Sequence, residues 1–196
     1  AGKGEAVKQL REWLDPRHIR VKADKPQPLN QHQTFWQPYA RFIPAEGQIM
    51  VLFGNWYSDL LSTAMHTSNP LDDTMFDDYV ENMRAFEQDL KNNHVDVLKV
   101  WFDLPWKSLQ KRLDGMEPSE VRWHKLHGLD WRNKKQYDAL QRLRQRFTDD
   151  WIIIDGEDET QRDQHFAQSI LRALKHCPEH LSKAHSKWKQ ANILSS

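Results

Sequence analysis

The sequence predicts an α/β domain in which a mostly parallel sheet is covered by helices on both faces. Three apolar runs have the length and composition of buried strands, at residues 48–53, 95–102 and 151–156. Three longer segments repeat apolar residues at helical spacing, at residues 5–14, 72–91 and 160–176. Strands that alternate with helices in this way are typical of a parallel sheet with helical crossovers.

Smaller elements fill the first third of the chain. The opening helix is expected to end at Asp15-Pro16, because the residue before a proline disfavours the α-helical region. After it come, in order, a short strand at residues 18–23, a proline-containing loop at 24–33 and an aromatic-rich helix at 35–42. Gly47 and Gly54 bound the apolar run at 48–53, as turn residues do at the ends of a strand.

The second half of the chain alternates charged and apolar segments. Its smaller elements are a short helix at residues 105–113, an irregular segment at 114–130 and a strongly charged helix at 131–147. Together, the elements predict one domain at residues 1–177. The remaining residues, 178–196, are expected to form a tail or a linker to a further domain.

Composition excludes several classes of protein. The 28 basic and 28 acidic side chains balance, which argues against a dedicated nucleic-acid binder. No apolar run reaches the length of about 18 residues that a membrane helix requires, so no membrane span is expected. The single cysteine, Cys177, cannot form an internal disulfide and is interpreted as an inert thiol, which favours a cytoplasmic location.

Gly2-Lys3-Gly4 stands at the start of the first helix. Glycines followed by a helix N-terminus can bind phosphate through backbone N–H groups, and Lys3 adds a positive charge. A complete phosphate loop also has an earlier glycine and a preceding strand. The alternative is a flexible terminus that happens to contain these residues. If the loop is real, its first strand and its beginning are expected to precede Ala1 in a longer parent protein.

Acidic side chains near the strand ends are the candidates for catalysis beside Lys3. Ligands of open parallel sheets bind at the carboxyl ends of the strands, where Asp103 and Asp155 are expected. The run at 48–53 has no acid at its end, and the nearest one is Asp59. An equally good interpretation of Asp103 is the cap of the helix that opens at Pro105.

The segment from Glu117 to Arg132 contains cations that could close over bound phosphates. Arg122, Lys125 and Arg132 are the candidate lid residues, because arginine and lysine bind phosphate oxygens. A solvated surface loop is the alternative. His124 and His127 have a spacing seen in metal sites, but without a third ligand nearby they do not predict zinc.

Ordered segments along nearly the whole chain resemble the second family of polyphosphate kinases, especially the polyphosphate:AMP phosphotransferases that carry two such domains in tandem. The matching segments are Ala1-Gly2-Lys3-Gly4-Glu5, Leu14-Asp15-Pro16-Arg17, the stretch from Arg41 to Gly47, Asn55-Trp56-Tyr57, Phe86-Glu87 with Leu90, Leu98-Lys99-Val100-Trp101, Gln110-Lys111-Arg112 and Asp130-Trp131-Arg132. Their order and intervals make the match more specific than any one segment.

The resemblance implies a fold, an activity and partners. It implies a three-layer α/β/α phosphate-loop kinase fold with a helical lid, and transfer of a phosphoryl group from polyphosphate to AMP, giving ADP, with Mg²⁺. It assigns phosphate binding to Gly2, Lys3 and Gly4, and lid contacts to the three cations named above. It also implies a second domain of the same family, with homo-oligomers as a further expectation.

Three positions depart from the family pattern. Phe53 and Gly54 occupy the places of an aspartate or asparagine and an arginine, and Pro38 that of another arginine. These groups supply electrostatic stabilisation in phosphoryl transfer, so their loss favours a catalytically silent domain that holds polyphosphate or supports an active second domain. An ATP-dependent nucleoside monophosphate kinase is a third hypothesis, but it lacks the tryptophan-tyrosine and aspartate-tryptophan-arginine segments.

Overall fold

The computed structural model describes residues 2–29, 34–65, 71–117 and 130–175. Helices and strands follow one another in the order α1 (Lys3–Trp13), β1 (Ile19–Ala23), the 3₁₀ helix η1 (Gln37–Phe42), β2 (Ile49–Phe53), α2 (Trp56–Ala64), α3 (Asp73–Asn92), β3 (Val100–Asp103), α4 (Trp106–Asp114), α6 (Lys134–Gln145), β4 (Ile152–Asp155) and α7 (Glu159–Lys175). Among the described helices, none is long and apolar enough to cross a membrane.

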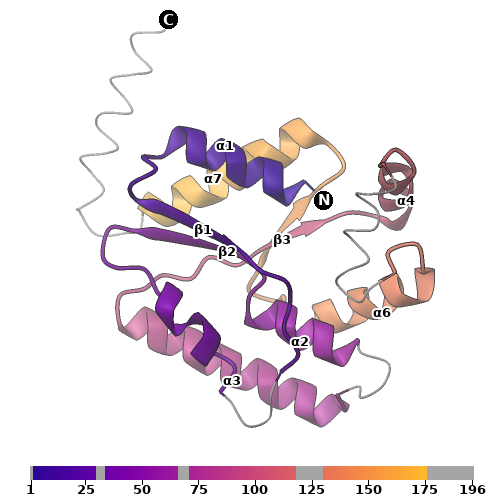
Figure 1. The fold of residues 1–196 in the computed structure, drawn as a ribbon, viewed down its shortest axis with the longest axis horizontal. Helices are drawn as coiled ribbons and strands as arrows, with labels where there is room; N and C mark the ends of the chain where they lie inside the picture. The colour runs from indigo at the N-terminus through magenta and orange to yellow at the C-terminus, as the bar shows by residue number, and fades with distance from the viewer. Residues whose placement is uncertain (1, 30–33, 66–70, 118–129, 176–196) are drawn as a thin grey trace, which may run out of the picture.

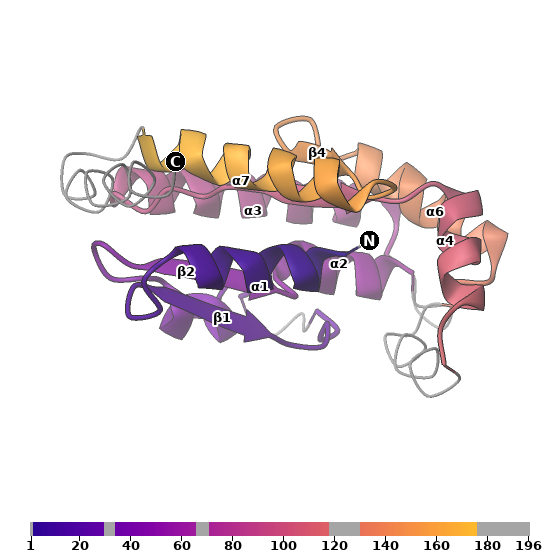
Figure 2. The same cartoon turned by 90° about the horizontal axis from the view of Figure 1, so that it is seen from above.

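The helices cover the strands from two sides. Helices α1 and α7 lie side by side on one face, and α2 and α3 lie on the other (Figures 1 and 2). The strands pair in parallel, β1 with β2 and β3 with β4. The prediction of a parallel sheet between two helical layers is therefore confirmed.

The strands form two separate pairs within the described residues, and this differs from the single sheet that was expected. Each strand therefore pairs along one edge only, and all five residues of β2 stay partly exposed. The prediction that the run at 48–53 is a strand buried on both faces is thus wrong in its burial. Its apolar composition nevertheless fits a strand that has neighbours on both edges.

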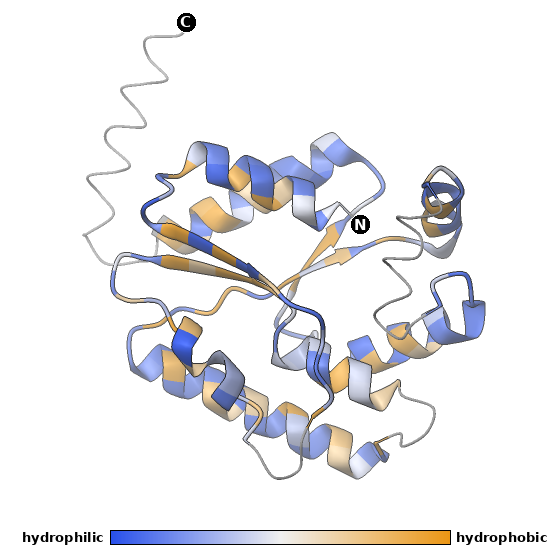
Figure 3. Cartoon of the chain, viewed as in Figure 1, coloured by the Kyte–Doolittle hydropathy of each residue, from blue (hydrophilic) through white to orange (hydrophobic). Residues whose placement is uncertain are grey.

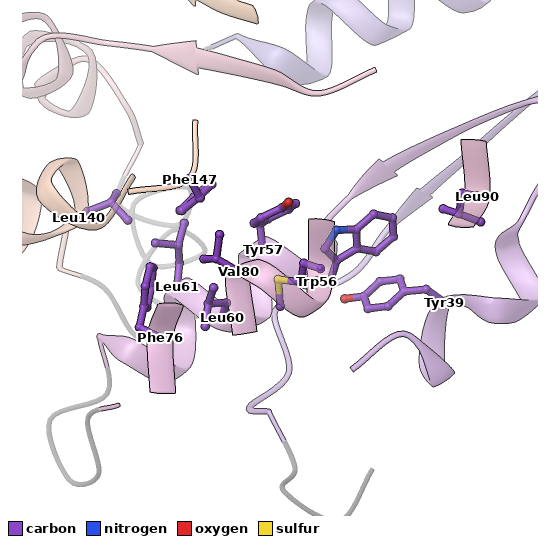
Figure 4. Close-up of a cluster of buried hydrophobic side chains, with 11 residues drawn as sticks. Tyr39, Trp56, Tyr57, Leu60, Leu61, Phe76, Val80, Leu90, Leu140 and Phe147 are labelled. Carbon is purple, nitrogen blue, oxygen red and sulfur yellow. The ribbon is translucent and has the colours of Figure 1, made fainter. Parts of the chain in front are cut away.

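Two apolar clusters hold the layers together. The smaller joins α1 and α7 to the strands and is centred on Leu10, Ile154 and Phe166. The larger packs aromatic residues of α2 and η1 against α3, with Trp56, Tyr57 and their neighbours drawn in Figure 4. The strands are mostly apolar, whereas the helices alternate between apolar and hydrophilic residues (Figure 3). Burial of these faces is the main contribution to the stability of the fold.

Side chains placed just before the helices fix where several of them begin. Asn55 accepts a hydrogen bond from the Ser58 amide at 3.1 Å, and Asp72 accepts one from the Met75 amide at 2.8 Å. Each satisfies a backbone donor that has no partner within the helix. Asn133 does the same for α6, so this helix starts at Lys134 rather than at 131 as expected.

Two further boundaries differ from the sequence prediction. Residues 95–99 are not part of a strand, and β3 begins at Val100, because Val95 and Val97 pack against the larger apolar cluster instead. The aromatic helix predicted at 35–42 is a 3₁₀ helix, with Pro38 in its first turn. Proline fits the start of a helix because its missing N–H would have no partner there.

A buried carboxylate joins the larger cluster to the start of β3. Glu87 of α3 is 8% exposed and accepts hydrogen bonds from Trp56 Nε1 at 3.0 Å and from Lys99 Nζ at 2.6 Å. Lys99 also pairs with Asp150 at 2.5 Å. A buried charge costs little free energy only when such partners surround it. The hydrogen bonds of Glu87 connect α2, α3 and the residue that precedes β3.

We expect substitutions at Glu87 to destabilise the protein in graded steps. Glu87→Gln can still accept the indole hydrogen bond but leaves Lys99 with one acid, and should lower the free energy of unfolding by about 1–3 kcal/mol. Glu87→Ala removes both contacts and should cost about 3–5 kcal/mol. Urea unfolding measures both. Glu81→Gln, on the exposed face of α3, is the control and should change stability by less than about 0.5 kcal/mol. Equal losses of unfolding free energy at Glu87 and Glu81 would contradict the assignment of Glu87 to a buried hydrogen-bond network.

Candidate phosphate-binding site

The N-terminus of α1 has the backbone geometry of an anion-binding site. Gly2 is its N-cap residue, with φ 76° and ψ 6°, a left-handed conformation that glycine adopts without strain. The amides of Glu5 and Ala6 donate to the Gly2 carbonyl at 3.1 Å. The earlier N–H groups of a helix lack partners within it and carry the positive end of its dipole. An anion placed here is stabilised by both.

This helix N-terminus lies between the ends of strands from both pairs. The Lys3 ammonium is 5.9 Å from the centroid of the Phe53 ring, at the carboxyl end of β2. Gly2 touches the guanidinium of Arg162, in the first turn of α7, which follows β4. The three residues selected for phosphate binding, Gly2-Lys3-Gly4, therefore lie at the edge of the sheet where ligands of parallel sheets bind.

The surroundings of Lys3 affect its ionisation. More than a third of the residue surface is exposed, but the ammonium lies close to the aromatic ring at the end of β2. Desolvation by these neighbours lowers the pKa of Lys3 below the ordinary lysine value. A bound anion would oppose this shift, because it favours the charged form of the amine.

Sequence patterns did not single out Arg162, yet the structure brings it to this site. The residue is 1% exposed, and its Nε donates to Asp163 Oδ1 at 2.7 Å. Its Nη1 is 3.8 Å from Glu159 Oε1 and has no hydrogen-bond partner among the described residues. An arginine within a highly charged helix carries no sequence signal of burial, since most such residues face solvent.

Asp59, the acid nearest to β2 in the chain, is turned into the protein. It is 5% exposed, and its carboxylate accepts hydrogen bonds from Tyr39 Oη at 2.5 Å and from the Gln27 amide at 2.8 Å. Burial raises the pKa of Asp59, although both hydrogen bonds favour its charged form. The contacts join α2 to η1 and to the loop after β1.

Asp103 and Asp155 end neighbouring strands and stand opposite each other in the register of β3 and β4. The Asp103 carboxylate accepts a hydrogen bond from Gln141 Nε2 at 3.2 Å and lies 3.4 Å from Arg144 Nη1. The alternative role of Asp103 as a helix cap is wrong, since Pro105 is the N-cap of α4 and no side chain caps that helix. Asp103 thus remains the candidate acid at a strand end.

Of the proposed lid residues, Arg122 and Lys125 lie outside the described residues, as do His124 and His127. Arg132 lies at the other end of that segment, where its guanidinium binds Asp114 at 2.7 Å and the Leu113 carbonyl at 3.3 Å. It therefore ties the residues just before α6 to the end of α4. In the ranges that the structure describes, no three acidic, histidine or cysteine side chains gather to hold a metal ion by themselves.

The departures at the end of β2 have a clear structural setting. Phe53 places its ring beside Lys3, where a carboxylate would otherwise pair with the amine. Gly54 has φ 83°, and a Cβ added there would lie 2.5 Å from the Asp24 carbonyl oxygen. No side chain fits at this position without a shift of the backbone after β1.

Comparison with known proteins gives a consistent result. The family model described as Polyphosphate kinase 2 matches residues 1–190. A protein of Acinetobacter johnsonii named polyphosphate:AMP phosphotransferase is 77% identical over 98% of this chain, and another of that name from Pseudomonas syringae pv. tomato is 31% identical over 89%. The chain spans only 41% and 36% of the lengths of these two relatives.

Solved structures agree with the fold. The crystal structure of polyphosphate kinase 2 from Arthrobacter aurescens TC1 superposes with a TM-score of 0.73 over the whole chain and 72% of its own length, at 19% identity. A crystal structure from Pseudomonas aeruginosa PA01 has a TM-score of 0.71 at 29% identity, and covers 90% of this chain and 36% of its own. The chain belongs to the polyphosphate kinase 2 family, as its segment order and its α/β fold predicted.

Proposed function

We propose that the protein to which this chain belongs transfers a phosphoryl group from inorganic polyphosphate to AMP and produces ADP. The observation that carries the proposal is the N-terminus of α1, with Gly2 and Lys3, at the carboxyl ends of the strands. The 77% identity to a protein named polyphosphate:AMP phosphotransferase supports the choice of substrates.

The reaction requires positioning and charge stabilisation more than covalent chemistry. An oxygen of the AMP phosphate attacks the terminal phosphorus of polyphosphate, and the bond from that phosphorus to the next bridging oxygen breaks. ADP forms, and the polyphosphate chain is one phosphate shorter. The backbone N–H groups at Gly2-Lys3-Gly4 and the Lys3 ammonium would hold phosphate oxygens and offset the negative charge that develops on them.

Magnesium fits this proposal. Mg²⁺ is commonly held by one or two carboxylates together with the phosphates of the substrate, so a complete protein cage is unnecessary. Asp103 and Asp155 offer carboxylates at adjacent strand ends, and Asp155 Oδ1 already accepts the Glu157 amide at 2.8 Å. When bound, the ion would neutralise charge on the transferring phosphate. We assign to Asp103 the role of holding this Mg²⁺ ion.

The proposed domain covers residues 1–177, with 178–196 as a tail or linker. The half-buried β2 supports a further strand beside it, contributed by residues that precede Ala1 in a longer protein. A second domain of the same family is part of the proposal, because the relatives are more than twice as long as this chain. Homo-oligomers are part of the proposal through the family resemblance alone. The single cysteine favours the cytoplasm.

A second candidate function is a silent domain that holds polyphosphate for an active partner domain. The specific observation in its favour is the Phe53 ring beside Lys3, together with the glycine that follows it. Neither residue can bind a metal ion or a phosphate through its side chain. Binding would then remain while turnover is lost.

The decisive experiment measures ADP formation from AMP, polyphosphate and Mg²⁺ by the protein in its full natural length. We expect Lys3→Ala and Asp103→Asn to lower the rate by about a hundredfold or more, as loss of one stabilising group does. Lys8→Ala, on the exposed face of the same helix, is the control and should keep the rate. If both variants keep the full rate of ADP formation and the protein still binds polyphosphate, this domain is the catalytically silent one and the reaction takes place elsewhere in the protein.

Asp59→Asn separates a structural from a catalytic acid. We expect this variant to keep turnover per folded molecule, because both Asp59 oxygens already bind Tyr39 and Gln27. Its free energy of unfolding should fall by about 1–3 kcal/mol, since an amide replaces one acceptor oxygen by a donor. A large loss of rate with unchanged urea unfolding would instead make Asp59 a catalytic group.

The lowered pKa of Lys3 predicts a distinctive pH dependence of binding. The amine binds phosphate only when it is charged, so tripolyphosphate affinity should fall with rising pH before ordinary lysines lose their protons. Lys3→Arg should bind with an affinity that stays level, because arginine remains charged. Isothermal titration between about pH 7 and about pH 10 measures both, with Lys8→Arg as control. Identical pH profiles for wild type and Lys3→Arg would remove Lys3 from the site.

The close contact at Gly54 predicts a stability difference between two glycines. Gly47 and Gly54 both have positive φ, but a Cβ at Gly47 meets nothing within 4 Å. Gly47→Ala should therefore cost about 1 kcal/mol of unfolding free energy from backbone strain alone. Gly54→Ala should cost roughly 1–3 kcal/mol more, because the Asp24 carbonyl must move. Equal urea midpoints for the two variants would contradict the contact.

A further inference from the structure

The guanidinium of Arg162 is an unusual group to find in the interior of this domain. Arg162 is the largest fully buried side chain in the part of the chain that the structure describes. Its described polar contacts are the hydrogen bond to Asp163 at 2.7 Å and the longer approach to Glu159, 3.8 Å away and largely exposed. Asp163 is itself shared, since it accepts a hydrogen bond from Gln9 Nε2 at 3.0 Å. A buried charge with so few partners costs free energy, unless a further acceptor compensates it.

The unsatisfied end of this side chain is directed at the start of α1. A Cβ built on Gly2 would lie 1.8 Å from Arg162 Nη1 and 2.4 Å from its Cζ, so the guanidinium rests directly against the N-cap residue. Nη1 is the atom that has no hydrogen-bond partner among the described residues. A positive donor thus adjoins the positive end of an 11-residue helix. Two adjoining positive groups repel each other, and an anion bound between them would offset this repulsion.

We propose that Arg162 is a second cation of the phosphate site, and that its Nη1 donates to the phosphate group bound at the N-terminus of α1. The proposal rests on the function proposed above and adds a residue to its site. Lys3 approaches the site from the side of β2, and Arg162 from the side of β4. The two cations together would hold the same phosphate group from opposite directions.

The roles of the two cations differ in kind. Lys3 extends from the helix and can follow a moving phosphate, whereas Arg162 is fixed by burial and by its Nε contact with Asp163. A guanidinium fixed in this way presents its N–H donors in a rigid planar arrangement that matches phosphate oxygens. The phosphate that it binds can belong to polyphosphate or to the nucleotide, since both offer the same oxygens.

The test compares ligand binding by the full natural protein and three variants. Arg162→Met keeps most of the buried volume and removes the charge. Arg162→Lys keeps a positive charge but has a single ammonium group in place of the three guanidinium nitrogens. Arg172→Met, on the exposed part of α7, is the matched control. Tripolyphosphate and AMP are titrated separately by calorimetry, to identify which ligand supplies the phosphate. Urea unfolding checks that each variant is folded.

We expect Arg162→Met to weaken binding of one of the two ligands by roughly tenfold to a hundredfold, as loss of a charged hydrogen bond does. Arg162→Lys should recover part of the affinity, and Arg172→Met all of it. Because the pKa of Lys3 is lowered, Lys3 loses its proton at a lower pH than an ordinary lysine, and the wild-type binding that remains as pH rises should depend on Arg162. Substitution of a residue that only supports the fold would not specifically remove the ligand binding that remains at alkaline pH.

Wild-type affinity for both ligands in either folded Arg162 variant would overturn the proposal. If Arg162→Met does not fold, Arg162→Lys decides alone, because lysine cannot place a donor at both guanidinium positions. Binding is measured without turnover, so the outcome is distinct from the enzyme assay. Phosphate binding that depends on Arg162 without ADP formation would remove the proposed reaction and retain the site.

Discussion

The contact between Gly2 and the buried guanidinium of Arg162 fixes the place where α1 begins. A Cβ at position 2 would lie 1.8 Å from Arg162 Nη1, so the guanidinium occupies the space that any side chain at this position would need. The smaller apolar cluster then holds α1 against α7 and the strands. As a consequence, the positive end of the helix stays at the carboxyl ends of β2 and β4, and the geometry of the site follows from there.

Several residues that carry the family resemblance have structural roles. Trp56, Glu87 and Lys99 belong to one buried hydrogen-bond network, which connects three segments of the larger core. Arg132 anchors the segment before α6 to the end of α4. These contacts explain how a domain can keep these family residues while the positions beside its proposed phosphate site change.

Much of the fold could be predicted from the sequence, because the period of apolar residues reports directly on burial. The helix at 72–91 and the run at 48–53 are long or apolar enough to leave little ambiguity. The start of β3 could not be predicted, since Val95 and Val97 are apolar for a different reason and pack against helices. Arg162 was missed for a related cause: a charged residue in a charged helix has no pattern that marks it as buried. For Lys3, the glycines around it predict a phosphate site, and the structure adds the neighbouring Phe53 ring, which no sequence pattern indicated.

The backbone at Gly54 also bears on how this chain could evolve. An arginine at this position would place a side chain where the Asp24 carbonyl already lies, in a left-handed conformation. The segment after β1 would have to move before such a side chain could fit. Residue 54 and the segment after β1 are therefore expected to change together, so this one glycine restricts which substitutions the end of β2 can accept.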